Sequence, residues 1–125
     1  MLRILIVDDS QFFREQLKDI LHELGYERIS EAPDGRVALR KLLREIYDLV
    51  FLDWLMPNVN GIQFLNAVRR NQVICDVPIV MMTCQAEQHN IMEAVKAGAN
   101  SYMVKPIDKE SIRNKLIELG FIKND

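Results

Sequence analysis

Short apolar runs alternate with amphipathic helical segments along the whole chain, and this alternation constrains the possible fold more than any other feature. The apolar runs predict strands at residues 2–7, 28–32, 48–53, 78–83 and 101–104. Helices are predicted to follow them at residues 10–24, 34–43, 61–70, 87–97 and 108–119. Repeated strand–helix units imply an α/β fold, with a parallel sheet covered by helices on both faces and joined by right-handed crossovers.

The spacing of these segments does not give the order of the strands in the sheet. For five units of this size we expect, by analogy alone, the flavodoxin-like order 2-1-3-4-5. A length of 125 residues suits a single domain over residues 1–125, without a repeat or a linker.

The composition excludes several functional classes. A net charge of −2 gives no electrostatic case for binding nucleic acid, and no apolar stretch is as long as a membrane span. The only two cysteines, Cys75 and Cys84, show no metal-binding spacing, which favours a reduced, cytoplasmic setting over a disulfide framework.

Acidic residues stand at the ends of two predicted strands. Asp8 and Asp9 directly follow the first apolar run, and Asp53 ends the third. Ligands of open α/β sheets bind outside the carboxyl ends of the strands, so the three carboxylates are expected in one pocket. Like charges repel, and such a pocket needs a cation; oxygen ligands favour a hard ion such as Mg²⁺.

Two more polar residues end strands of the same predicted sheet. Thr83 ends the fourth apolar run and Lys105 follows the fifth. Taken singly, the polar residues at these strand ends have simpler interpretations. An Asp at the end of a strand often caps the next helix, and a Thr is a common β-branched strand residue. Together, an ammonium, a hydroxyl, carboxylates and a metal form a cradle for a phosphoryl group.

This pattern resembles the response-regulator receiver domain over nearly the whole chain. The resemblance rests on residues 7–10, 53–61, 82–83 and 97–106, which occur in order and at matching separations. Within this family the chain is most similar to the single-domain chemotaxis regulators of the CheY type, through residues 53–58 and through Asn90 and Ile91.

The resemblance implies a role for each residue of the acidic pocket. Asp53 matches the carboxylate that accepts a phosphoryl group from the phosphohistidine of a kinase. Asp9 matches a direct Mg²⁺ ligand, and Asp8 one that acts mostly through water. The backbone carbonyl of Leu55 takes the metal-binding position two residues after the acceptor. Lys105 is expected to pair with a phosphoryl oxygen.

The resemblance also implies a switch and its partners. Thr83 matches a hydroxyl that moves onto the phosphoryl group, and Tyr102 matches an aromatic side chain that then turns inward. The output face is expected on the fourth helix, fifth strand and fifth helix, with Ile91, Tyr102 and Lys115 exposed. The implied partners are a CheA-like histidine kinase and a downstream protein such as the flagellar motor switch, for a monomer or weak dimer. The Lys105–Pro106 bond is expected to be cis.

Two other functions must be weighed against this interpretation, and the sequence differs from the CheY pattern at three positions near the pocket. A Mg²⁺-dependent phosphohydrolase would need an acid/base carboxylate two residues beyond the nucleophile, where the chain has Leu55. A degenerate docking receiver would not need the intact pocket residues. Leu55, Cys84 and Gln85 each depart from the CheY pattern, and we expect a slower loss of the phosphoryl group as a result.

Overall fold

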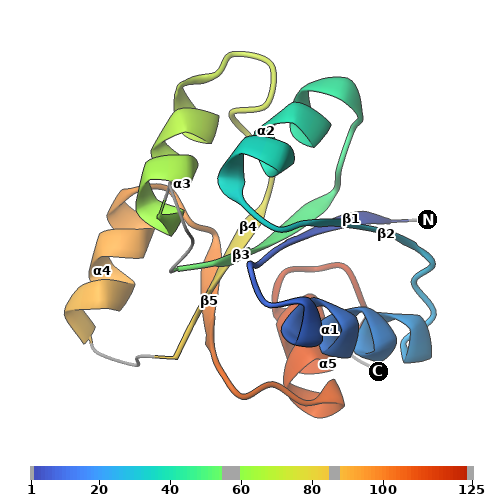
Figure 1. Ribbon diagram of the computed structural model, residues 1–125. Helices are drawn as coiled ribbons and strands as arrows, with labels where there is room; N and C mark the ends of the chain where they lie inside the picture. Colours follow the sequence, from blue (N-terminus) through green and yellow to red (C-terminus); the bar gives the residue numbers. More distant parts are fainter. Residues whose placement is uncertain (1, 55–59, 85–87, 124–125) are drawn as a thin grey trace.

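The computed structural model describes residues 2–54, 60–84 and 88–123, and for residues 88–91 it describes the backbone alone. Five parallel strands form one sheet in the order β2-β1-β3-β4-β5 (Figure 1), which confirms the expected topology. The strands are β1 (Arg3–Val7), β2 (Arg28–Ala32), β3 (Leu49–Asp53), β4 (Ile79–Thr83) and β5 (Ser101–Val104).

Five helices alternate with these strands, within one or two residues of the predicted ranges. They are α1 (Gln11–Glu23), α2 (Gly35–Arg44), α3 (Gly61–Arg70), α4 (Gln88–Lys96) and α5 (Lys109–Glu118). Side-chain oxygens of Ser10, Asp34, Asn60 and Asp108 accept the first free backbone N–H groups of α1, α2, α3 and α5, respectively. These caps explain why the four helices begin where they do.

The helices form two layers, one on each face of the sheet. Helices α1 and α5 lie together on one face, while α2, α3 and α4 cover the other (Figure 1). Alternate residues of β1 belong to opposite layers: Ile4 and Ile6 pack with α1 and α5, and Leu5 and Val7 pack with α2 and α3. Two apolar cores therefore hold the sheet from both sides.

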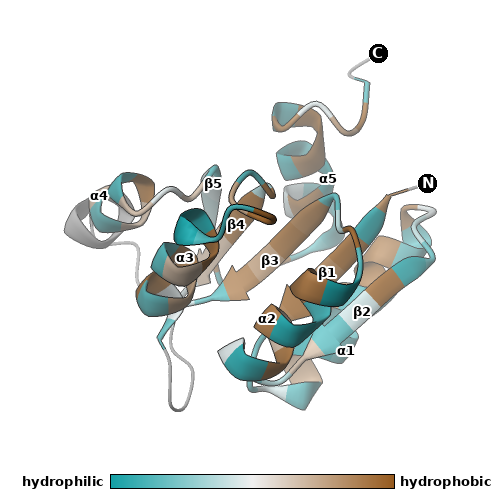
Figure 2. Cartoon of the chain, turned by 90° about the horizontal axis from the view of Figure 1, so that it is seen from above, coloured by the Kyte–Doolittle hydropathy of each residue, from teal (hydrophilic) through white to brown (hydrophobic). Residues whose placement is uncertain are grey.

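The central strands are apolar on both faces, as the unbroken apolar runs predict. Every residue of β3 and β4 is buried, and β1 and β3 are strongly hydrophobic in Figure 2. Strand β2 lies at an edge and is mostly half-buried, which accounts for its weaker sequence signal. Among the described helices, none combines the length and the apolar character that crossing a bilayer requires.

Candidate functional site

Three carboxylates meet at the carboxyl edge of the sheet, as predicted. Asp8 follows β1 and Asp53 is the last residue of β3, its neighbour in the sheet. One carboxylate oxygen from each of Asp8, Asp9 and Asp53 lies within 4.8 Å of the others. Asp8 and Asp53 are buried and Asp9 is exposed, so the pocket opens to solvent on the side of Asp9.

Backbone hydrogen bonds continue the strand ladder past the ends of the strands and hold the site residues in place. The Asp8 N–H donates to the Ala32 carbonyl at 3.1 Å. On the other side, the Lys105 N–H donates to the Thr83 carbonyl at 2.8 Å. The sheet itself therefore fixes where these side chains begin, which is the rigid support that a binding constellation needs.

The first turn of α1 fixes the orientation of Asp8. Its Oδ1 accepts the Ser10 N–H at 2.9 Å, and its carbonyl accepts an N–H of Arg14 at 2.6 Å. The Arg14 guanidinium also donates to Glu31 on β2 at 3.2 Å. With both its carboxylate and its carbonyl held, Asp8 presents Oδ2 to the pocket.

Lys105 joins the ends of β1, β3 and β5. Its ammonium donates to Asp8 Oδ2 at 2.8 Å and to Asp53 Oδ1 at 3.3 Å. The Nζ atom also lies 3.9 Å above the centre of the Phe13 ring. In the sequence, Phe13 falls on the apolar stripe of the first helix. The helical period gives the face of a side chain, but not which residue across the sheet it meets.

Burial and neighbouring charges perturb both partners of this ion pair. Burial raises the pKa of Asp53 to about 6; the Asp8 carboxylate adds to the rise, and Lys105 opposes it. Burial alone would lower the pKa of Lys105. The hydrogen bonds and negative charges of Asp8 and Asp53 outweigh burial and raise this pKa above its ordinary value. The pocket therefore favours a charged ammonium beside a carboxyl that ionises reluctantly.

The donor set of the pocket fits a hard divalent cation. Carboxylate oxygens are the ligands that Mg²⁺ and Ca²⁺ prefer, and the exposed side leaves room for the waters that Mg²⁺ retains. When all three carboxylates are ionised, one ammonium leaves a net charge of about −2 in a partly buried site, which a divalent ion would balance. Leu55, whose carbonyl is expected to be a further ligand, lies outside the described residues.

The remaining predicted pocket residues lie at the same edge. Thr83 is buried at the end of β4, beside β3 and β5. Trp54 follows Asp53 and is partly exposed. The Lys105–Pro106 bond is cis, as the resemblance implied. Cys84 is exposed directly after Thr83, and Gln85 lies outside the described residues.

The predicted output face is described only in part. Tyr102 on β5 is 38% exposed, and its inward turn on activation stays a prediction. Lys115 is less exposed than expected, because its ammonium donates to Ser101 Oγ at 2.8 Å and to Glu118 at 2.9 Å. It also lies 5.7 Å from the centre of the Tyr102 ring. The side chain of Ile91 lies outside the described part of the chain.

Sequence and structure comparisons agree with this geometry. Residues 4–117 match the family of the response regulator receiver domain. The chain is 38% identical to the chemotaxis protein CheY-3 of Vibrio cholerae serotype O1, over 92% of this chain and 88% of that protein.

Solved structures share the fold at similar coverage. The Vibrio cholerae chemotaxis protein CheY4 superposes with a TM-score of 0.88 at 33% identity, covering 94% of this chain and 98% of that one. The receiver domain of a Pseudomonas aeruginosa sensor histidine kinase superposes with a TM-score of 0.84 at 27% identity, covering 94% and 95%. That structure has a magnesium ion coordinated in its active site cleft.

Proposed function

The chain belongs to the response regulator receiver domain family, and on this premise we propose that Asp53 accepts a phosphoryl group from a histidine kinase with Mg²⁺ as cofactor. The observation that carries the proposal is the meeting of three carboxylates within 4.8 Å, with the Lys105 ammonium bonded to two of them. Asp8, Asp9 and the Leu55 carbonyl, together with Asp53, would hold the metal. The domain comprises residues 1–125.

The proposed reaction is an in-line displacement at phosphorus. A carboxylate oxygen of Asp53 forms a bond to phosphorus while the bond from phosphorus to the imidazole nitrogen breaks. The electron pair of that bond stays on the nitrogen, which leaves as a histidine that can take up a proton. When bound, Mg²⁺ supplies neutralising charge for the phosphoryl oxygens.

Residues of this chain supply the rest of the stabilisation. The Lys105 ammonium already faces Asp53 and can pair with a phosphoryl oxygen. Thr83, at the end of the neighbouring strand, supplies a hydroxyl on the other side. Transfer to water by the same route returns the free carboxylate. The protein thus promotes its own phosphorylation and dephosphorylation, and we do not assign it a separate substrate.

The family relatives favour a role in chemotaxis. The 38% identical protein of Vibrio cholerae is a chemotaxis protein, and it is similar in length to this chain. We therefore propose a CheA-like histidine kinase as the donor and a protein target such as the flagellar motor switch. Both partners act in the cytoplasm, where the free cysteines Cys75 and Cys84 would stay reduced. The switching unit is a monomer or weak dimer.

The output proposal follows from the strands that border the pocket. Thr83 ends β4 and Tyr102 lies on β5, its hydrogen-bonded neighbour. A movement of the Thr83 hydroxyl towards a phosphoryl group frees space that the Tyr102 side chain can take up by turning inward. The changed surface would be that of α4, β5 and α5, with Ile91, Tyr102 and Lys115 on it.

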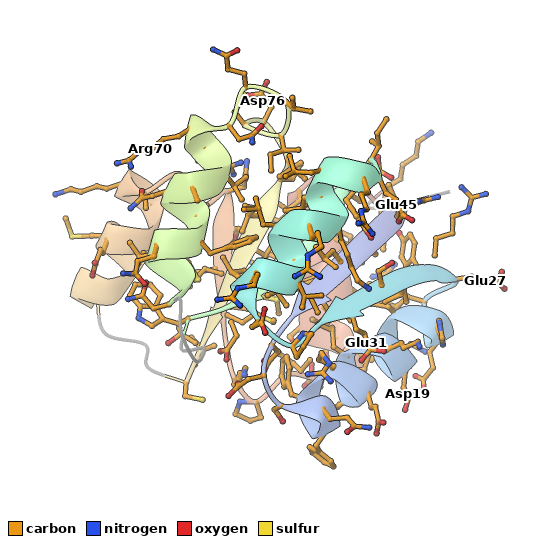
Figure 3. All side chains as sticks on the ribbon, turned by 45° about the horizontal axis from the view of Figure 1, so that its top comes forward. Asp19, Glu27, Glu31, Glu45, Arg70 and Asp76 are labelled. Atoms are coloured by element: carbon orange, nitrogen blue, oxygen red, sulfur yellow. The ribbon has the colours of Figure 1, made fainter. Side chains whose placement is uncertain are left out.

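Acetyl phosphate and intact-mass measurement test this function. The parent protein is expected to gain one phosphoryl group with Mg²⁺ and none with a chelator. Asp53→Asn should abolish the gain. Asp19→Asn is the matched control, because Asp19 is an exposed carboxylate on α1 (Figure 3) and its loss should leave the gain unchanged. An undiminished gain in Asp53→Asn would contradict the assignment.

The same assay separates the rival functions. A phosphohydrolase would release phosphate from many equivalents of donor without accumulating a phosphorylated protein. A docking receiver would neither gain mass nor release phosphate. The intact Asp8, Asp9, Asp53, Thr83 and Lys105 argue against the docking receiver. Leu55, where a phosphohydrolase would need an acid/base carboxylate, argues against the phosphohydrolase.

A further inference from the structure

The Lys105 ammonium is enclosed on three sides, and one of these sides is not a carboxylate. Two sides are oxygens of Asp8 and Asp53, at 2.8 and 3.3 Å. The third is the face of the Phe13 ring, whose centre is 3.9 Å from Nζ. The negative face of an aromatic ring attracts a cation, most strongly where water is excluded.

The Phe13 ring is held firmly in this position. It is 7% exposed and belongs to the core between the sheet and helices α1 and α5. That core includes Met103 and Ile107, which lie two residues before and after Lys105. The Phe13 N–H donates to Ser10 Oγ at 3.2 Å, in the same turn that orients Asp8. One helical turn therefore places both the carboxylate and the ring against the ammonium.

The ring differs from the other two partners in what happens to it during the reaction. The carboxylate of Asp53 loses its charge when it becomes an acyl phosphate, and both carboxylates share theirs with a bound metal. Phe13 is neutral, is not a metal ligand and takes no part in the bond changes. Its attraction for the ammonium therefore persists when the carboxylates are engaged elsewhere.

We propose that Phe13 is a positioning residue for phosphoryl transfer, which holds the Lys105 ammonium at Asp53 through the face of its ring. The inference rests on the proposed function, because it assigns Lys105 to a phosphoryl oxygen. Without the ring, the long lysine side chain would sample other rotamers as the carboxylates turn to the metal. When a phosphoryl donor enters the pocket, the ammonium would then less often be in place to pair with a phosphoryl oxygen.

Graded fluorination of the ring tests this proposal. Fluorine withdraws electron density from the ring face while changing the size and apolar character of the side chain little. Phenylalanines carrying one, two and three fluorines are placed at position 13, and the rate constant for phosphorylation by acetyl phosphate with Mg²⁺ is measured. We expect a stepwise fall that reaches about five- to thirtyfold, the range for a desolvated cation–π contact.

Position 64 provides the matched control. Phe64 is 2% exposed and lies in the core on the opposite face of the sheet, away from Lys105. The same fluorinated residues there should leave the rate constant unchanged. If the rate is equal across the series at position 13, or if it falls as much at position 64, Phe13 acts as ordinary core and the proposal is overturned.

A readout without phosphorylation separates this inference from the proposed function. Protons above an aromatic face are shifted upfield, so the ε-methylene protons of Lys105 should be shifted upfield in the parent. Phe13→Leu, which keeps an apolar core residue, should remove the shift and slow phosphorylation. The shift should survive addition of Mg²⁺; its loss would overturn the inference. A parent that shows the shift but is never phosphorylated would instead contradict the proposed function alone.

Discussion

Ionisation of the buried Asp53 carboxyl is expected to destabilise the folded protein, and this loss should appear in the pH dependence of stability. Its pKa is raised to about 6 by burial and by Asp8, so the folded protein binds this proton more tightly than the unfolded chain does. For such a group, folding stability is highest at low pH and falls as the pH rises from about 4 to about 6. The cost then persists at neutral pH.

Asp53→Asn is therefore expected to stabilise the metal-free protein at neutral pH. After allowance for solvent at the open side of the pocket, the gain should be about 1–2 kcal/mol, and it should vanish near pH 4. Denaturant unfolding in a chelating buffer at several pH values measures it. Mg²⁺ at neutral pH should stabilise the parent more than the variant. A gain of the same size at pH 4 would show that ionisation is not the cause.

Gly61 allows the first turn of α3 to approach the end of β3. A Cβ atom at this position would lie 2.8 Å from the Asp53 carbonyl oxygen and 3.1 Å from Met81 Sδ. Gly61→Ala is expected to destabilise the fold by about 1–3 kcal/mol, since backbone and core atoms must move. Because one of these atoms belongs to Asp53, phosphorylation should slow as well.

The control for this change lies on the same helix. Asn66→Ala alters a partly exposed position in the interior of α3, away from the end of β3. It should change neither stability beyond about 0.5 kcal/mol nor the phosphorylation rate. Equal effects of the two variants on phosphorylation would argue against the close approach as the reason for glycine.

At the scale of elements, Arg69 connects the end of α3 to two loops. Its guanidinium donates to the carbonyls of Cys75 and Val77 in the loop before β4, at 2.9 and 2.7 Å. It also donates to the Gly98 carbonyl and to Asn100 Oδ1 in the loop between α4 and β5, at 2.8 and 2.9 Å. The planar fork of five N–H groups suits this arrangement, and a lysine could not reproduce it.

Arg69→Lys is expected to cost about 2–3 kcal/mol of unfolding free energy, because it leaves half-buried carbonyls without donors. Hydrogen exchange should accelerate in residues 97–100, next to the proposed output face. Arg70→Lys is the control, since Arg70 is exposed and points away from the protein (Figure 3). Chemical denaturation and amide exchange compare the two. Equal losses of stability would show that the guanidinium contacts contribute little.

For the molecule as a whole, the sequence predicted the fold and the pocket because both depend on local patterns. Strands buried on two faces are continuous apolar runs, and the residues that end parallel strands must share one edge. That reasoning placed Asp8, Asp53 and Lys105 correctly. The order of the strands needed analogy, since the lengths of the crossovers do not determine which strands become neighbours.

Contacts between side chains of distant elements could not be predicted from the sequence. Arg69 and Arg70 are identical neighbours in the sequence. Only the fold shows that Arg69 bonds to two loops while Arg70 is exposed to solvent. Lys115 was predicted to be exposed on the output face, yet Ser101 on the neighbouring β5 accepts a hydrogen bond from its ammonium. Such contacts depend on the separation and rotation of packed elements, which residue periodicity does not specify.

Lys115 also bears on the switch that we propose for the whole molecule. Its ammonium lies 5.7 Å from the centre of the partly exposed Tyr102 ring, and this contact stabilises the ring in the position that the structure shows. A ligand at Asp53 can move Tyr102 only by binding the inward state more tightly than the outward one. The free-energy difference between the two positions of Tyr102 must therefore be small enough for the phosphoryl group to reverse.

Fluorotyrosine labelling tests this coupling with controls inside the same molecule. The chain has three tyrosines, and Tyr47 is 6% exposed just before β3, at the edge of the sheet opposite Asp53. With Mg²⁺ and a beryllofluoride mimic, we expect the fluorine signal of Tyr102 to shift and that of Tyr47 to stay. Asp53→Asn should abolish the shift, whereas Lys115→Ala should enlarge the inward population before the mimic is added. A Tyr102 signal that the mimic leaves unchanged would exclude this side chain from the switch, because a ring that moves from solvent to the core cannot keep the same environment.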